Sequence, residues 1–297
     1  MKDGSAGRAA HTSLRPGDSG YPRKLLGIHR PPDPLHVQGS FRDWERPCVA
    51  IVGSRAASSG GRRMARDLAA DLSLRGFVIA SGFARGIDGA AHEGALGVGG
   101  ATLAVVGTGL DVIYPHEHET LRKAVMASGA MISEFPSGSP PRAYHFPRRN
   151  RILAGLCEAV VVVEAEMKSG ALNTARWALD MGREVLAVPR SPWEPGSEGV
   201  NRLLRDGAAP AVDAEDVLAA LGSFPDPPGG QDPSQRVLAL LKASGSTGPA
   251  VILEELADLD PERLLSVLGR LEAMGSIVSG PKGYTIPRGI GAGSPTP

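Results

Sequence analysis

The sequence predicts an α/β fold: a doubly wound, mostly parallel Rossmann-like sheet, followed by a small C-terminal winged-helix domain. Short apolar runs alternate with helical patterns from residue 48 to about residue 221. These runs are almost continuously apolar, which is typical of parallel strands that helices cover on both faces. Beyond a stretch rich in proline and glycine, three helical patterns and a hairpin pattern form a separate small unit.

The N-terminal residues precede the predicted sheet. Residues 1–20 are polar, rich in glycine and aperiodic, so we expect a disordered tail there. Residues 21–46 place apolar side chains among prolines, which predicts an ordered N-terminal arm packed on the domain that follows.

The Rossmann-like domain is predicted at residues 47–222. Its expected strands are 48–53, 77–82, 101–107, 130–135, 159–165 and 184–189. The first helical pattern carries Met64, Leu68 and Leu72 at intervals of four on one face. Further helices are expected near 88–96, 117–127, 170–181 and 213–222. The stretch "HFPRRNRILAGL" (145–156) is predicted as a turn-like segment ahead of the fifth of these strands.

The C-terminal part is predicted as a second domain. Residues 223–234 form a Pro/Gly-rich linker, and 235–287 form a winged-helix-like domain. Its helices are expected near 235–243, 250–257 and 261–273, ahead of a hairpin, and 288–297 as a disordered tail. The expected recognition helix carries two arginines and two glutamates, fewer net positive charges than a major-groove reader usually has. We therefore expect a partner or dimer contact there, with weak DNA binding as the alternative.

Composition restricts the function classes. The 32 basic and 32 acidic side chains balance, which excludes nucleic-acid binding by bulk charge but leaves room for a local basic site. The two cysteines, Cys48 and Cys157, lie beside apolar runs and fit buried small side chains in a reducing compartment. Because no apolar run has transmembrane length and no signal-peptide pattern is present, we expect a cytoplasmic protein without a membrane partner.

The candidate binding residues follow the predicted strands. Ligands of open α/β sheets bind at the carboxyl ends of the strands. The residues there are Gly53, Ser54 and Arg55; Ser81, Gly82, Arg85, Gly86 and Asp88; Arg142, Phe146, Arg149, Asn150 and Arg151; and Lys168, Ser169, Gly170 and Thr174. Each group alone resembles an ordinary capped turn between strand and helix. Their convergence at one edge predicts a binding site for a polyanion.

The identity of the polyanion is narrowed by missing motifs. The first turn reads "GSRAASSGG" rather than GxGxxG, and no GxxxxGK[ST] occurs, which disfavours dinucleotides and P-loop ATP binding. His116 and His118 lack further ligands at metal spacing, so we predict no metal, no cofactor and no catalytic residue. Glu134 and Glu164, at strand ends, fit either a hydrolase or, more commonly, partners for neighbouring arginines.

Phe146 beside the arginines favours single-stranded nucleic acid. Bases stack on such rings at about 1–3 kcal/mol each, while guanidinium groups contact the phosphates. Alternatively, Phe146 only packs its segment against the core. The residues alone favour neither interpretation over the other.

Several segments together resemble the DNA-processing protein A family, also called DprA or Smf. They are "VGSR" (52–55), "SGFARGIDGAAHEGAL" (81–96), "VVGTGLDVIYP" (105–115), "SEFPSGSPP" (133–141), "HFPRRNRILAGL" (145–156), "VVVEAEMKSGALNTA" (161–175) and "GREVLAVP" (182–189). The resemblance covers about 21–212. It implies a cytoplasmic, non-enzymatic, dimeric protein that binds and protects single-stranded DNA and loads the RecA recombinase onto it during natural transformation.

The resemblance also implies roles for individual residues. Arg55 and the loop 81–88 would line the DNA pocket, Phe146 would stack on a base, and Arg149 and Arg151 would contact phosphate or shape the pocket, with Asn150 between them.

The sequence departs from the family pattern in three places. Ala143 replaces a common lysine, and Arg190 replaces a common glycine. Only about 45 residues precede the sheet, too few for the N-terminal helical domain of many members in addition to the arm.

Two enzyme classes remain as alternatives. A nucleotide hydrolase like the lysine-decarboxylase-like phosphoribohydrolases has a related sheet and carries a PGGxGTxxE loop. Here the matching loop, "KSGALNTARWA", lacks the glutamate, which argues against turnover. A dinucleotide-dependent enzyme is third, because GxGxxG is missing.

Overall fold

The computed structural model describes residues 11–222, 233–256, 261–273, 276–281 and 283–287. The chain divides into two compact units, at 1–225 and 226–297. The predicted tail at 288–297, nearly all of the predicted linker and the first ten residues lie outside the described residues.

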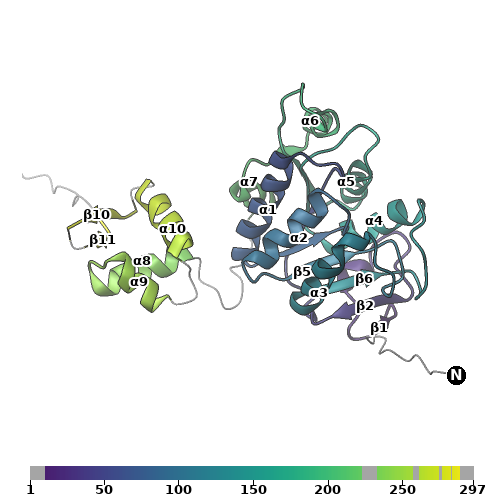
Figure 1. Ribbon diagram of the computed structural model, residues 1–297, viewed down its shortest axis with the longest axis horizontal. Helices are drawn as coiled ribbons and strands as arrows, with labels where there is room; N and C mark the ends of the chain where they lie inside the picture. The colour runs from purple at the N-terminus through teal and green to yellow at the C-terminus, as the bar shows by residue number, and fades with distance from the viewer. Residues whose placement is uncertain (1–10, 223–232, 257–260, 274–275, 282, 288–297) are drawn as a thin grey trace, which may run out of the picture. The chain divides into compact units, whose positions relative to one another are not determined.

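The first unit is built on a nine-stranded sheet with the order β1-β2-β6-β5-β4-β3-β7-β8-β9 (Figure 1). The strands are β1 (Thr12–Leu14), β2 (Leu35–Gly39), β3 (Cys48–Val52), β4 (Val78–Ser81), β5 (Thr102–Val105), β6 (Ala130–Ser133), β7 (Ala159–Val162), β8 (Glu184–Ala187) and β9 (Ala209–Pro210). Strands β3 to β9 run parallel, and β1 and β2 add an antiparallel edge. The predicted mostly parallel α/β fold is confirmed.

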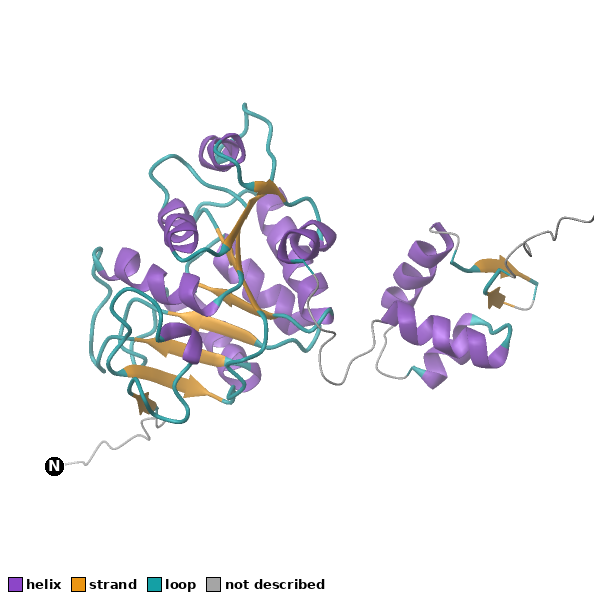
Figure 2. Ribbon diagram, turned by 180° about the vertical axis from the view of Figure 1, so that it is seen from behind, coloured by secondary structure: helices purple, strands orange, loops and turns teal. Residues whose placement is uncertain are grey.

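Helices cover both faces of this sheet (Figure 2). Helices α1 (Ser59–Leu74), α2 (Ile87–Gly97), α3 (Glu119–Ser128) and α7 (Ala214–Leu221) lie on one face, and α4 (His145–Leu156), α5 (Gly170–Asp180) and α6 (Ser197–Arg205) lie on the other. Alternate residues of one strand therefore enter different cores. In β3, Val49 and Ile51 pack toward α1, whereas Ala50 and Val52 pack toward α4. Both sets are buried, which explains the continuous apolar run.

The order of the strands reverses between β3 and β7. The chain runs outward from β3 through β4 and β5 to β6, and then returns to β7 on the other side of β3. Loops at the carboxyl ends of β3 and β7 therefore lead to opposite faces and leave a crevice between them, the usual ligand position in such sheets.

Helix α1 forms where its apolar spacing predicts it. The hydroxyl of Ser58 accepts a hydrogen bond from the Gly61 amide and caps the first turn. Leu68 and Leu72 are buried and Met64 is partly buried, as their spacing predicts.

Residues 145–156 correct the sequence prediction, because they form helix α4 rather than a turn-like segment. Ile152, Leu153 and Leu156 are buried on the sheet, and their spacing is helical. Pro147 lies in the first turn, where its missing amide hydrogen costs little. The three arginines of this segment interrupt the apolar pattern, so the sequence does not indicate a helix there.

The N-terminal prediction also needs correction. Thr12–Leu14, predicted as part of a disordered tail, form β1 and pair with β2 of the arm. Ser13 Oγ lies 2.8 Å from His36 Nδ1, which fixes this pairing. The arm itself contributes Leu25 and Leu35, both fully buried in the core.

The second unit consists of α8 (Pro233–Ser244), α9 (Pro249–Glu255), α10 (Pro261–Ala273) and the hairpin of β10 (Val278–Gly280) and β11 (Gly283–Thr285). Leu241, Ile252, Leu264 and Leu268 form its core. Three helices followed by a hairpin are the element order predicted for a winged helix. Within the described residues, no helix is both long and apolar enough to span a bilayer.

Candidate nucleic-acid interface

A cavity of about 820 Å³ opens at the carboxyl ends of β3, β4 and β7. We call it the main cavity. Most of the residues predicted for binding line it: Gly53, Ser54, Arg55, Gly82, Asp88, Phe146, Arg149, Asn150, Lys168, Ser169, Gly170 and Thr174. The structure therefore brings together side chains from three βα loops and from α4, as the convergence argument predicts.

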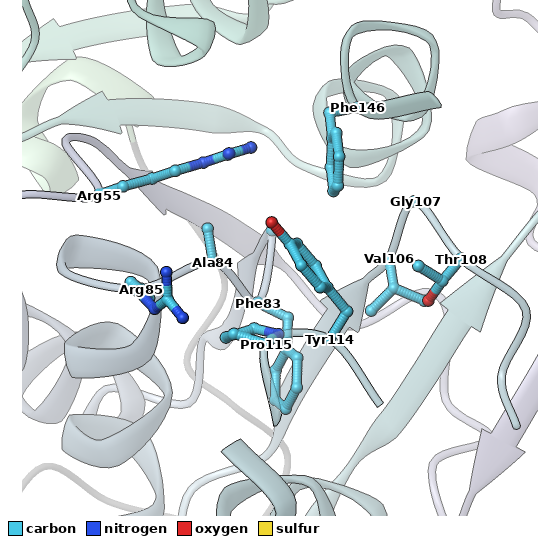
Figure 3. A pocket seen from close by; sticks show the side chains of 11 residues that line it. Arg55, Phe83, Ala84, Arg85, Val106, Gly107, Thr108, Tyr114, Pro115 and Phe146 are labelled. Atoms are coloured by element: carbon cyan, nitrogen blue, oxygen red, sulfur yellow. The ribbon is translucent and has the colours of Figure 1, made fainter. Parts of the chain in front are cut away.

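A side pocket of about 40 Å³ adjoins the main cavity (Figure 3). Arg55, Tyr114 and Phe146 line both spaces, and Arg85 and Thr108 line only the side pocket. The Arg55 guanidinium lies 4.9 Å from the centre of the Phe146 ring. Figure 3 shows the rings of Tyr114 and Phe146 pointing toward one another, with centroids 5.7 Å apart. An aromatic wall with a cation at its mouth results.

Helix α4 presents one face to the main cavity. Phe146, Arg149, Asn150 and Leu153 line it, at the spacing that places helix residues on one side. His145, rather than Phe146, anchors the start of the helix: its ring is buried, stacks on Phe135 and bonds the Gly107 carbonyl through Nδ1 at 2.9 Å. Phe146 remains half-buried, with part of its ring available in the cavity wall.

Arg149 places a positive charge inside the cavity wall. Its side chain is 5% exposed, and Nη1 donates a 2.7 Å hydrogen bond to the Gly82 carbonyl. Burial lowers the pKa of Arg149 to about 10, while nearby Asp88 acts in the opposite direction. A Cβ atom at Gly82 would lie 2.5 Å from the Arg149 guanidinium, so a side chain there would displace it. A cation so poorly hydrated favours an anionic ligand.

Asp88 supplies the opposing charge. Burial raises the pKa of its carboxyl, and Arg149 offsets this only partly. One oxygen accepts a 3.2 Å hydrogen bond from the Ala84 amide. The carboxyl also lines the main cavity, so its charge state alters the local field.

The N-terminus of α5 closes another side of the cavity. Ser169 caps the helix by accepting a hydrogen bond from the Ala171 amide. Asn150 Nδ2 donates 3.1 Å hydrogen bonds to the Gly170 carbonyl and to Asn173 Oδ1, which ties α4 to α5. Exposed Lys168 precedes this helix end, and cations and helix N-termini are both favourable for phosphate.

Arg151, which the sequence predicts as a pocket residue, does not line either space. It is 5% exposed and donates to both carboxylate oxygens of Glu134, at 2.8 and 3.0 Å, and to the Arg30 carbonyl. Positions 149 and 151 differ by two residues and so point to different sides of α4. Arg148 shares the same carboxylate at 2.7 Å. Glu134 is thus a partner for arginines, as one of the two sequence interpretations held.

Three further predicted residues are not part of the main cavity lining. Ser81 is buried and donates to the Ile51 carbonyl at 2.6 Å. Gly86 precedes α2 with a φ of 76°, where the backbone of Ser54 leaves no room for a Cβ atom. Arg142 is exposed and bonds the Tyr144 hydroxyl at 2.9 Å.

Glu164 occupies the position at which a Rossmann-like fold normally holds a phosphate. Its buried carboxylate accepts hydrogen bonds from the Ser58 amide and hydroxyl at the start of α1. It also pairs with Arg190 at 2.6 Å, and a Cβ atom at Gly61 would collide with it. The protein therefore supplies its own anion to this helix end.

Sequence reasoning missed several residues of the two spaces. Thr108 and Tyr114 line the side pocket, and Glu166 lines the main cavity. The signal for Tyr114 was its position in the loop after the third predicted strand. No three His, Cys, Asp or Glu side chains gather as metal ligands in the described part of the chain.

The chain is similar to known proteins of one family. The family model for DNA recombination-mediator protein A matches residues 12–222, which contain both spaces. Protein Smf of Escherichia coli is 41% identical over 285 residues, covering 91% of this chain and 76% of that protein. DNA processing protein DprA of Streptococcus pneumoniae is 43% identical over 202 residues, covering 68% and 71%.

Two solved structures are similar to this chain. The X-ray structure of Streptococcus pneumoniae DprA has a TM-score of 0.69 and 41% identity, covering 72% of this chain and 75% of that one. Helicobacter pylori DNA processing protein A, whose structure is described for its single-stranded DNA binding mode, has a TM-score of 0.65 and 28% identity, covering 72% and 96%. The resemblance predicted from the sequence is confirmed: the chain belongs to the DNA recombination-mediator protein A family.

Proposed function

We propose that this protein is a recombination mediator that binds single-stranded DNA in the main cavity. One observation carries the proposal: Arg55 lies over the Phe146 ring at the mouth of a cavity whose wall contains the buried Arg149. Family membership and the similarity to a protein described as binding single-stranded DNA support it.

The arrangement suits a flexible single strand. Arg55, Lys168 and the N-terminus of α5 contact the phosphates, and a base stacks on the available part of the Phe146 ring. A duplex keeps its bases inside the stack, so it offers phosphates but no base to Phe146. The site therefore discriminates between single and double strands through stacking rather than through charge.

We propose no catalytic turnover. Both strand-end glutamates are engaged: Glu134 pairs with Arg148 and Arg151, and Glu164 with Arg190. A hydrolase that used either glutamate to activate water would need that carboxylate free. The phosphoribohydrolase alternative thus loses the two strand-end carboxylates that the sequence offered it.

The finer role follows from family membership and belongs to the same proposal. We infer that the protein works in the cytoplasm as a homodimer, protects incoming single strands and transfers them to the RecA recombinase during natural transformation. The matched family description, a recombination mediator, supports this assignment.

The test compares single-stranded and double-stranded binding by fluorescence anisotropy with labelled oligo-dT and its duplex. We expect single strands to bind more tightly. Phe146→Ala should weaken single-strand binding by about fivefold or more, since stacking contributes about 1–3 kcal/mol per base. Phe146→Tyr should retain most of the affinity, because it keeps the ring.

Tyr144→Ala is the matched control. Tyr144 is an exposed aromatic two residues from Phe146 and does not line the main cavity, so its loss should leave affinity unchanged. Equal binding of duplex and single strand, or full affinity in Phe146→Ala, would refute the proposed function.

A further inference from the structure

The indole ring of Trp193 is exposed to solvent. It is 94% exposed, whereas the other two tryptophans, Trp44 and Trp177, are partly buried. Tryptophan has the largest apolar side chain, and its exposed ring offers a planar face on which a ligand can stack. Nothing in the established family assignment accounts for it.

The loop that carries Trp193 lies beside the main cavity. Residues 189–196 follow β8, which pairs in parallel with β7, and the loop after β7 supplies Lys168 and Ser169 to the cavity. The two loops are joined directly: the Ala165 amide donates to the Gly196 carbonyl at 2.8 Å, and the Gly199 amide donates to the Ala165 carbonyl at 2.7 Å. Trp193 is therefore at the same edge of the sheet, one strand further along.

The loop is held in one shape. Arg190 bridges Glu164 at 2.6 Å and Glu194 at 2.8 Å. Asn201 Nδ2 donates to the Arg190 carbonyl at 2.9 Å, and buried Ser197 donates to the Pro192 carbonyl at 3.3 Å. An exposed indole on a fixed loop loses little conformational entropy when a planar ligand stacks on it.

Both signs of charge occur around the indole. Glu194, the exposed neighbour of Trp193, shares Arg190 with Glu164, so this one guanidinium offsets only part of the charge of the two carboxylates. Lys168 and half-exposed Met167 lie on the adjoining loop after β7, together with exposed Glu166. Since charges of both signs stand there, stacking on the indole rather than ion pairing supplies the contact that we consider for a single strand.

We propose that the 189–196 loop is a second contact site for single-stranded DNA and that Trp193 stacks on a base that has left the main cavity. The inference rests on the proposed function and extends the same site over β8. It assigns to Arg190, which departs from the common family glycine, the role of a positioning residue that fixes the loop.

A single strand fits this surface better than a second copy of the chain does. Within the loop, exposed Ser191 and Glu194 interrupt the apolar surface of Trp193 and Pro192, so the loop by itself presents no broad apolar patch. Protein interfaces bury their aromatic anchors at the centre of such patches. A strand leaving the cavity needs only one exposed ring for each base.

The test uses the full chain and labelled oligo-dT of about 4 and about 16 nucleotides, lengths that bracket the site sizes of single-strand binding folds. We expect Trp193→Ala to weaken binding of the longer oligonucleotide by about fivefold or more and to leave the shorter one unchanged. Trp193→Phe should retain most of the affinity. Tryptophan fluorescence of the wild type should be quenched by the longer oligonucleotide, and Trp193→Phe should abolish that quenching.

Leu179→Ala is the control, since it truncates another exposed apolar side chain near the opposite end of α5. Equal affinity of wild type and Trp193→Ala for both lengths, without quenching, overturns this inference but leaves the proposed function intact. Failure of the wild type to bind either length overturns both. A change in sedimentation of Trp193→Ala without a change in DNA affinity would assign Trp193 to self-association and overturn the inference.

Discussion

Arg149 and Arg151 show how two neighbouring, similar residues acquire different tasks. Both are 5% exposed. Arg151 has a bidentate carboxylate partner in Glu134, so its charge is compensated within the protein. Arg149 bonds a carbonyl and faces a carboxyl whose own burial disfavours ionisation, so its charge remains available to a ligand. The second arrangement is that of a binding residue.

Asp88 gives the site a pH dependence. Burial raises its pKa, so it becomes neutral at a higher pH than an ordinary carboxyl does. Above that pH the carboxylate repels phosphate in the cavity, and below it the repulsion disappears. Asp88→Asn should therefore bind single-stranded DNA more tightly than the wild type at pH 7, and the difference should shrink as the pH falls.

The stability of the folded protein should also depend on the charge of Asp88. A raised carboxyl pKa in the folded state removes stability as the pH rises through that pKa. As the pH rises, the free energy of unfolding of the wild type should therefore fall relative to that of Asp88→Asn. Anisotropy and urea titrations of both proteins across the pH range check this. A constant difference in affinity at every pH would contradict the assignment.

At the scale of elements, α4 has one functional face and one structural face. Phe146, Arg149 and Asn150 line the main cavity, while Arg151 and Arg148 bind Glu134 after β6. A substitution on the structural face should alter folding, and one on the functional face should alter binding.

Arg151→Met tests this separation. It leaves the buried Glu134 with only the half-exposed Arg148, so the free energy of unfolding should fall by about 3 kcal/mol. The single-strand affinity of the folded protein should stay the same. Arg148→Ala is the matched control, because it removes the exposed partner of the same carboxylate and should cost less than about 1 kcal/mol. Reduced DNA affinity with unchanged stability in Arg151→Met would place Arg151 in the binding site instead.

How well the sequence predicts an element depends on whether the buried residues of that element are apolar. Strands β3, β4, β7 and β8 could be located because they are buried on both faces and therefore continuously apolar. Helix α4 could not, because several of its buried residues are charged or polar, so its buried face does not appear as an apolar pattern in the sequence. Once α4 is read as a turn, the opposite orientation of Arg149 and Arg151 cannot be predicted. Glu134 and Glu164 were correctly weighed as arginine partners, but only the structure identifies which arginines.

At the scale of the whole molecule, the chain is neutral, but the main cavity contains arginines that form no salt bridge with a carboxylate of the described residues. Basic and acidic side chains balance at 32 each. Many of the arginines form ion pairs, as Arg66 does with Glu93 and Arg202 with Asp206. In contrast, Arg55 stacks on Phe146 and Arg149 bonds a carbonyl, both in the cavity. The local field rather than the net charge should therefore control binding.

The salt dependence of single-strand affinity in Arg55→Ala tests this account most directly. Counterion release lowers the logarithm of affinity linearly with the logarithm of salt concentration, by about 0.7 for each phosphate contacted on a single strand. We predict weaker binding by Arg55→Ala with a slope shallower by about 0.7, and an unchanged slope for the exposed control Arg63→Ala. An Arg55→Ala variant with the wild-type affinity and slope would contradict the claim that the main cavity holds the DNA backbone.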